Sequence, residues 1–132
     1  MKQLMFIFLI IFCVSSMPSA TAQGLTTSQK EKVALRKAQK LRKRLLKGRD
    51  FATLVRKFSD DPGSAPTGGE LGWVAWGQFV PAFEAAVAQL KPGELSEPVR
   101  TAFGYHVIQL IDRNDEQFNA RHILIKIPSE LP

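Results

Sequence analysis

The fold of this chain is decided by four short segments, which read FSDDPGS at residues 58–64, GGELGW at 68–73, GQFVPAF at 77–83 and FGYH at 103–106. Pro62 disfavours a helical conformation at the residue before it, so a helix that enters the first segment ends there. Residues 62–69 are rich in Gly, Pro, Ser and Thr, which predicts a loop. Pro81 in the third segment suits the first turn of a helix. Short helices should therefore alternate with extended chain.

Two helices are predicted before these segments. Ala34, Ala38, Leu41 and Leu45 recur at helical spacing among lysines and arginines, and Gly48 stands where a C-terminal cap belongs. The side chain of Asp50 is suited to cap a second helix with one apolar face. The apolar residues of that face are Phe51, Leu54, Val55 and Phe58.

A third helix and four strands complete the expected elements. The helix carries Phe83, Val87 and Leu90 on one face, and Pro92-Gly93 makes a turn after it. The expected strands are residues 71–75, 97–101, 105–112 and 119–127. Three to four helices around an antiparallel four-stranded sheet make an α+β domain, which should span residues 31–127 and leave 128–132 as a tail.

The N-terminus predicts export. A short basic start, an apolar run from Leu4 to Val14 and the small residues Ala20-Thr21-Ala22 are typical of a secretory signal peptide over residues 1–22. An uncleaved membrane anchor is the alternative. Residues 23–30 are expected to form a flexible leader. The chain's one cysteine, Cys13, lies in the signal, so a basic, disulfide-free domain in the periplasm or cell envelope is expected.

Together, the four segments resemble the signature of the parvulin-type peptidyl-prolyl cis/trans isomerases. Their order and spacing fit that family, but the family begins with a strand that reads like RHILIK, and here this motif comes last, at residues 121–126. The resemblance implies the parvulin fold, with its first strand supplied by the C-terminal segment. It also implies rotation about X-Pro peptide bonds without a cofactor.

The displaced strand leaves three arrangements open. It fills the first-strand position of its own domain, as in a permuted chain; it opens a second domain of a truncated tandem array; or it is exchanged between two chains in a dimer. We favour closure within the chain, because the strand at residues 105–112 would otherwise present an unpaired edge.

The two histidines, His106 and His122, are expected to be neighbours. A hairpin centred on Asn114 would place His106 directly opposite His122 and Leu110 opposite Phe118. Directly opposed side chains lie about 5 Å apart at their β-carbons. A register slip of one residue would send the histidines to opposite faces of the sheet.

The resemblance also implies which residues form the site. The apolar cup for a proline ring would consist of Leu71, Phe79 and Phe83, with Phe103 on its rim. The polar, catalytic positions would be Asp61, His106, His122 and Thr101. A structural role in the core is the alternative for the aromatic residues and for the histidine pair. Rotation about a bond requires no metal, so none is expected.

Unfolded or partly folded exported polypeptides that contain X-Pro are the expected partners. The Lys/Arg-rich residues 30–47 are interpreted as a solvated helix face, with weak attraction to anionic surfaces and no role in nucleic-acid binding. A non-catalytic, chaperone-like peptide-binding module is the alternative function, and a fragment of a tandem parvulin protein is another.

Overall fold

The computed structural model describes residue 24 and residues 26–129, so the predicted signal peptide and residues 130–132 lie outside the described residues. The helices are α1 (Thr27–Leu46), α2 (Phe51–Phe58) and α3 (Pro81–Ala88), with a short 3₁₀ helix η1 (Ala65–Thr67). The strands are β1 (Glu70–Ala75), β2 (Val99–Thr101), β3 (Gly104–Arg113) and β4 (Gln117–Ile125). The predicted α+β class is confirmed. None of the helices in the described part of the chain is long and apolar enough to cross a membrane.

Helix α1 begins within the residues that the sequence assigned to a leader. The Thr26 side chain accepts a hydrogen bond from the Gln29 backbone N–H, and the Gln29 side chain accepts one from the Thr26 backbone N–H. This reciprocal capping box satisfies two backbone donors that would otherwise lack partners, and it fixes the helix start at Thr27. The leader expected over residues 23–30 therefore extends too far.

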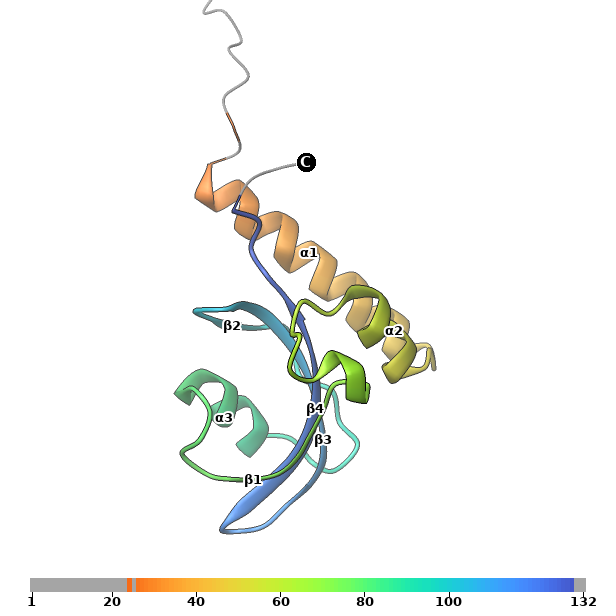
Figure 1. The fold of residues 1–132 in the computed structure, drawn as a ribbon, viewed down its shortest axis with the longest axis vertical. Helices are drawn as coiled ribbons and strands as arrows, with labels where there is room; N and C mark the ends of the chain where they lie inside the picture. Colours follow the sequence, from red (N-terminus) through yellow and green to blue (C-terminus); the bar gives the residue numbers. More distant parts are fainter. Residues whose placement is uncertain (1–23, 25, 130–132) are drawn as a thin grey trace, which may run out of the picture.

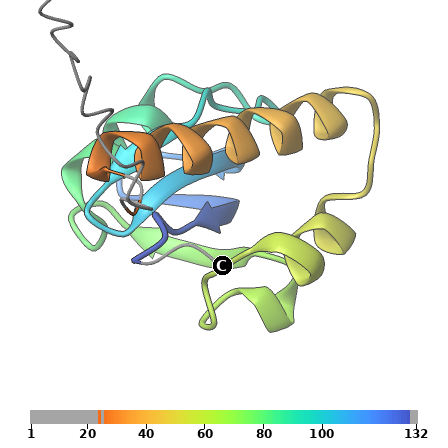
Figure 2. The ribbon, with the colours of Figure 1, turned by 90° about the horizontal axis from the view of Figure 1, so that it is seen from above.

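Helix α2 has the predicted cap. One Asp50 carboxylate oxygen accepts hydrogen bonds from the Thr53 backbone N–H at 2.9 Å and from the Thr53 hydroxyl at 2.7 Å. These two bonds from Thr53 lower the pKa of Asp50 below its usual value. In Figures 1 and 2 the chain reverses after α1, so that α2 runs in the opposite direction.

The sheet has the order β1-β4-β3-β2, and β4 lies between β1 and β3 with antiparallel pairing on both sides. The C-terminal strand therefore occupies a central position in the sheet of its own chain. This is the closure within the chain that we favoured from the sequence. Strand β2 is shorter than the predicted 97–101, and it begins directly after Pro98, which has no N–H to donate to a neighbouring strand.

The predicted register of the last hairpin is wrong by two residues. His106 pairs with Leu124, and His122 pairs with Ile108. Residues 114–117 form a longer turn than a hairpin centred on Asn114 allows, and an irregularity near Ile111 adds a further shift. The Asn114 side-chain oxygen accepts the N–H groups of Glu116 and Gln117, which stabilises this turn. An even shift keeps every side chain on its predicted face, so the two histidines are diagonal neighbours.

Each face of the sheet packs against different helices (Figure 1). Helices α1 and α2 cover one face, where Val107, Ile123 and Ile125 are buried. Helix α3 covers the other face, where Ile108, Leu110 and Phe118 are buried. Successive side chains of β3 and β4 point to opposite faces, so consecutive residues of these strands are buried on the two sides of the sheet. The site described below lies at the end of the α3 face.

Two glycines allow neighbouring segments to approach β4 closely. At Gly69 (φ +84°) an added β-carbon would lie 2.4 Å from the His122 carbonyl oxygen, and at Gly104 (φ +138°) it would lie 2.3 Å from the Ile125 carbonyl oxygen. Non-glycine residues rarely adopt positive φ, and no β-carbon tolerates these distances. Both glycines are therefore required for the close contacts that hold β4 in the sheet.

We predict that Gly104→Ala destabilises the chain much more than Gly93→Ala. Gly93 also has a positive φ (+89°), but an added β-carbon there has no neighbour within 4 Å. Gly93→Ala should cost about 1–2 kcal/mol of backbone strain, whereas Gly104→Ala should add a further 1–3 kcal/mol, roughly, from the clash with β4. Urea unfolding measures both changes, and equal losses in the two variants would contradict the close approach.

Candidate functional site

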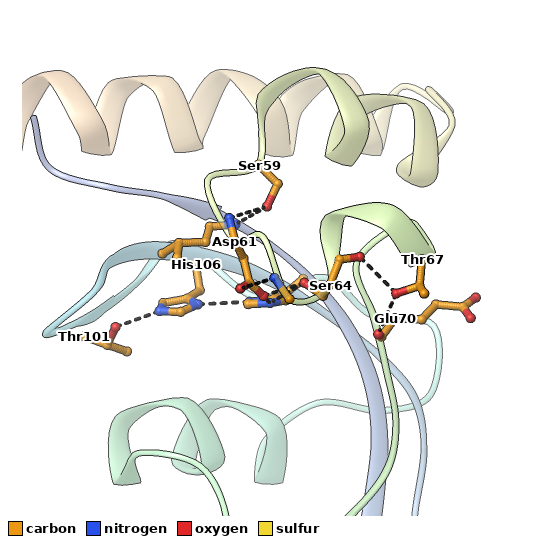
Figure 3. A network of polar contacts seen from close by, with 10 residues as sticks. Ser59, Asp61, Ser64, Thr67, Glu70, Thr101 and His106 are labelled. Atoms are coloured by element: carbon orange, nitrogen blue, oxygen red, sulfur yellow. Dashed lines mark hydrogen bonds and ion pairs between the residues drawn. The ribbon is translucent and has the colours of Figure 1, made fainter.

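Four separate elements bring the predicted polar residues together. Asp61 lies on the loop that leaves α2, Thr101 ends β2, His106 lies on β3 and His122 on β4. Figure 3 shows Thr101, His106, Asp61 and Ser64 in one network of polar contacts. His106 and His122 are 5% and 4% exposed. These buried imidazoles must find hydrogen-bond partners within the protein.

The network is a continuous chain of hydrogen bonds. Thr101 Oγ1 lies 2.6 Å from His106 Nε2, and His106 Nδ1 lies 3.1 Å from His122 Nδ1. His122 Nε2 lies 2.8 Å from Asp61 Oδ2. The imidazole rings are stacked, with centroids 5.3 Å apart. All four polar residues predicted from the sequence are therefore in contact.

One arrangement of protons satisfies every group in this chain while both histidines stay neutral. An ionised Asp61 only accepts, so His122 carries its proton on Nε2 and donates it to the carboxylate. His122 Nδ1 then accepts from His106 Nδ1–H, and His106 Nε2 accepts from the Thr101 hydroxyl. The Thr101 oxygen in turn accepts the Phe103 backbone N–H at 3.2 Å. Each ring thus fixes the tautomer of the other.

Two serines that the sequence analysis did not single out hold Asp61 in place. The Ser64 hydroxyl donates to Asp61 Oδ2 at 2.5 Å and lies 3.0 Å from His122 Nε2. Ser59 Oγ accepts from the backbone N–H groups of Asp61, at 3.4 Å, and Leu124, at 3.2 Å, and so links the loop to β4. The only sequence signal for these two roles is that both serines lie within three residues of Asp61 in the FSDDPGS segment.

All three pKa values in this network are lowered, although burial and hydrogen bonding contribute differently to each. Burial, reinforced by the nearby His122, lowers the pKa of His106 to about 4. Burial also lowers the pKa of His122, against the opposing effect of the Asp61 hydrogen bond and charge. Burial tends to raise the pKa of Asp61, but hydrogen bonds from Ser64, His122 and Gly63 outweigh it and lower the pKa. At neutral pH the site holds one carboxylate and two neutral imidazoles.

An open cavity of about 330 Å³ lies against this network. Phe79, Phe83 and Phe103, which the sequence assigned to the proline cup, contribute to its apolar wall. Phe83 is 1% exposed, and its ring stands nearly perpendicular to both imidazoles, with centroid distances of 5.4 and 5.6 Å. The full set of lining residues is Asp61, Gln78, Phe79, Val80, Phe83, Phe103, His106, His122 and Leu124.

Leu71 is not among the lining residues, although the sequence assigned it to the cup. It is half-buried and packs against the apolar cluster under α3. Gln78, Val80 and Leu124 line the cavity instead, and none of them was selected from the sequence. Gln78 and Val80 lie within the GQFVPAF segment, and this position was the sequence signal that could have identified them as lining residues.

Glu84 in the first turn of α3 holds the loop that forms this wall. Its carboxylate accepts the Gly77 N–H at 2.9 and 3.0 Å and the Phe79 N–H at 3.0 Å. The loop before α3 is thereby tied to the helix that carries Phe83. A negative charge at this end of a helix is also favoured by the helix dipole.

Within residues 24 and 26–129 no group of three His, Cys, Asp or Glu side chains is placed to hold a metal ion. The cavity presents an apolar surface beside a carboxylate and two imidazoles whose hydrogen bonds are directed.

The low pKa of His106 predicts a loss of stability in mild acid. An unfolded histidine has a pKa near 6.5, whereas the pKa of folded His106 is about 4. Between these values only the unfolded chain binds the proton, so the free energy of unfolding should decrease as the pH falls from 6.5 towards 4, by up to about 3 kcal/mol. Urea unfolding at several pH values measures this decrease.

Nitrogen NMR of the imidazoles provides the control. In the folded chain His106 should stay neutral at pH 5, with its proton on Nδ1, whereas both histidines should titrate near 6.5 in concentrated urea. A folded His106 that titrates near 6.5 would contradict the buried hydrogen-bonded pair.

Comparison with known proteins identifies the family. The model of the rotamase family, described as the PPIC-type PPIase domain, matches residues 14–112. The matched segment stops before β4 (Gln117–Ile125). This strand carries the RHILIK motif, which stands first in the family pattern described above.

The chain is 46% identical over 104 residues to the chaperone SurA of Nitrosococcus oceani, with 76% of this chain and 24% of that protein covered. It is 46% identical over 80 residues to the foldase protein PrsA of a Geobacillus species, with 61% and 29% covered. The crystal structure of the peptidylprolyl isomerase PrsA from Bacillus cereus is similar, with a TM-score of 0.58, 43% identity, and 62% of this chain and 32% of that chain covered. The chain thus spans about a quarter to a third of the length of these relatives, and it belongs to the family of PPIC-type peptidyl-prolyl isomerase (rotamase) domains.

Proposed function

We propose that this chain catalyses cis/trans isomerisation of X-Pro peptide bonds in unfolded or partly folded polypeptides. The observation that carries this proposal is the open cavity, because its apolar wall lies directly against the Asp61–His122–His106–Thr101 chain. Such a cavity offers an apolar surface to a proline ring and polar groups to the adjoining amide. Membership of the PPIC-type family supports the same reaction.

The reaction requires only that the twisted amide be bound more tightly than either planar form. The uncatalysed barrier to rotation about a peptide bond is about 18–20 kcal/mol, because rotation removes the amide resonance. In the twisted state the nitrogen regains its lone pair and becomes a better hydrogen-bond acceptor. A site that prefers this state lowers the barrier without forming or breaking a covalent bond.

The apolar residues would hold the proline ring. Phe83 forms the buried part of the wall, and Phe79 packs on it with a centroid distance of 4.9 Å. Phe103 is 59% exposed in the free chain and lies at the rim. A bound proline would cover part of its ring and gain about 25 cal/mol for each Å² of apolar surface removed from water.

The polar residues would act through a fixed pattern of charge and hydrogen bonds. Asp61 stays ionised and places a negative charge beside the cavity, where it would act on the polarised amide of the substrate. His106 and His122 stay neutral and hold the carboxylate in one orientation, with Thr101 completing the chain. In this proposal the histidines are positioning residues, and no proton is transferred.

We further propose that the chain acts outside the cytoplasm on exported polypeptides. The signal-peptide pattern in residues 1–22 supports this location. The relatives named above are a chaperone and a foldase, which supports polypeptide clients. The chain covers less than a third of the length of each relative. We therefore propose polypeptide clients for this domain alone and do not transfer the clients of the whole relatives to it.

Phe103→Ala should lower kcat/KM for X-Pro peptides about tenfold, mainly through a higher KM, because it removes an apolar contact with the bound ring. Isomerisation is measured by exchange NMR on peptides of the form Ala-X-Pro-Ala. Ile111→Ala is the matched control, since Ile111 is also exposed, at 40%, but does not line the cavity. Equal activity of the two variants would place the proline elsewhere.

Asp61→Asn should reduce kcat at least about tenfold with little change in KM, because the amide keeps the shape of the side chain but removes the charge. The variant should retain its fold, since the Asp61 side chain is 25% exposed and the amide can reach solvent. Unchanged kcat would exclude the carboxylate from the reaction. A wild-type chain that binds the peptides without accelerating exchange would instead be the non-catalytic binding module.

A further inference from the structure

A second, basic groove lies along the seam between α1 and α2. It has a volume of about 610 Å³, larger than the cavity beside the histidines. Its charged side chains are Arg44, Lys47, Arg49 and Lys57, against a single carboxylate from Asp50. That carboxylate is already engaged in capping α2 through Thr53. The groove therefore carries an excess of positive charge.

These cations are available to a ligand. Within the described residues, no carboxylate lies within 4.0 Å of the charged groups of Arg44, Lys47, Arg49 or Lys57. Arg42 and Arg100, by contrast, are paired with Glu97 and Glu31. Positive charges gathered without counter-charges raise the local potential and attract anions.

One end of the groove also has an apolar surface. Phe58 lines it, and its ring is approached by the Arg44 guanidinium at 5.5 Å and by the Lys37 ammonium at 5.9 Å from the centroid. Leu54 lines the groove beside it. An anionic ligand that also has apolar groups would match this combination.

The groove ends beside the loop that carries Asp61. Phe58 and Asp61 are three residues apart, so their Cα atoms are separated by at most about 11 Å. In Figure 3, Ser59 and Asp61 lie on the segment that leaves α2. The eight residues of α2 extend the groove about 12 Å away from this loop. An extended polypeptide would cover the stretch from Asp61 to Phe58 in about three residues and the further length of α2 in about three to four more.

We propose that this groove binds acidic residues of the same polypeptide whose proline occupies the cavity, and that it thereby selects X-Pro sites with Asp or Glu about three to six residues from the proline. The proposal rests on the proposed isomerase function. The groove acts as a separate binding subsite and takes no part in the rotation of the amide.

The test compares two peptides that share one X-Pro bond and differ only at two residues, which are Asp in one peptide and Asn in the other. These two residues stand four and five positions from the proline, and one such pair of peptides is made for each side of the proline. For one of the two placements, the Asp peptide should have about tenfold higher kcat/KM than the Asn peptide at low salt, because its KM is lower. The advantage should shrink to within about twofold at 0.5 M salt, roughly, because exposed charges are screened over a few ångströms there.

Two variants with the same change in charge separate the groove from the overall charge. Lys47→Gln/Lys57→Gln removes two groove cations, both exposed. Lys32→Gln/Arg36→Gln removes two exposed cations of α1 that do not line the groove. The first variant should abolish the preference for the Asp peptide and leave kcat/KM for the Asn peptide unchanged. Equal loss in both variants would overturn the proposal.

Binding of a labelled, proline-free Asp-rich peptide gives a readout that does not depend on isomerase activity. Wild-type chain should bind this peptide, and the groove variant should bind it about tenfold more weakly. Binding combined with no isomerisation of any peptide would refute the proposed function but not the groove. Groove-dependent binding to phosphatidylglycerol vesicles, without binding to the Asp-rich peptide, would overturn the proposal in favour of a membrane surface.

Discussion

The central position of β4 is the constraint on which the rest of the structure depends. This strand pairs with β1 on one side and β3 on the other, and its buried residues contribute to the core on both faces of the sheet. It also brings His122 to the hydrogen-bonded chain. The loop between α2 and η1 is tied to β4 as well, through Asp60 N–H to the Leu124 carbonyl at 2.7 Å. One strand thus connects the core with the site.

The polar chain illustrates how burial and satisfaction of hydrogen bonds act together. A buried imidazole without a partner would destabilise the fold, and a protonated pair would place two like charges in contact. Alternating donors and acceptors from Thr101 to Asp61 avoid both costs while the histidines stay neutral. The same arrangement holds a carboxylate at the cavity, so the stability of this region and its proposed chemistry have the same physical origin.

The two sides of the domain have different electrostatic character. On the α3 side, aromatic residues and neutral imidazoles surround a single carboxylate. On the side of α1 and α2, the apolar face of α1 is used in the core through Ala34, Ala38 and Leu41, so the helix presents its lysines and arginines to solvent. The groove between α1 and α2 concentrates this charge because Arg49 and Lys57 add to it from the loop and from α2.

The sequence by itself determined the class of fold, the approximate positions of the elements and most of the residues that meet at the candidate site. Helical and strand periodicities depend on local burial, and the cap at Asp50 depends on neighbours in sequence, so these features can be predicted without knowledge of the rest of the chain. The contact between the histidines was predictable because side chains alternate between the two faces of a strand, and a register shift of two residues leaves each side chain on the same face. Asp61, Phe79, Phe83 and Phe103 lie in the motif segments, and all four line the cavity.

Only the tertiary structure decided the register, the final membership of the site and the place of the last strand. The register depends on the turn at residues 114–117 and the irregularity near Ile111, whose geometry has no periodic signal. Leu71 is turned into the cluster under α3, while Leu124, far away in the sequence, lines the cavity. Whether RHILIK closes its own sheet depends on packing across β1 and β3, because the hydrogen bonds of a strand are made with distant segments that its own residues do not specify.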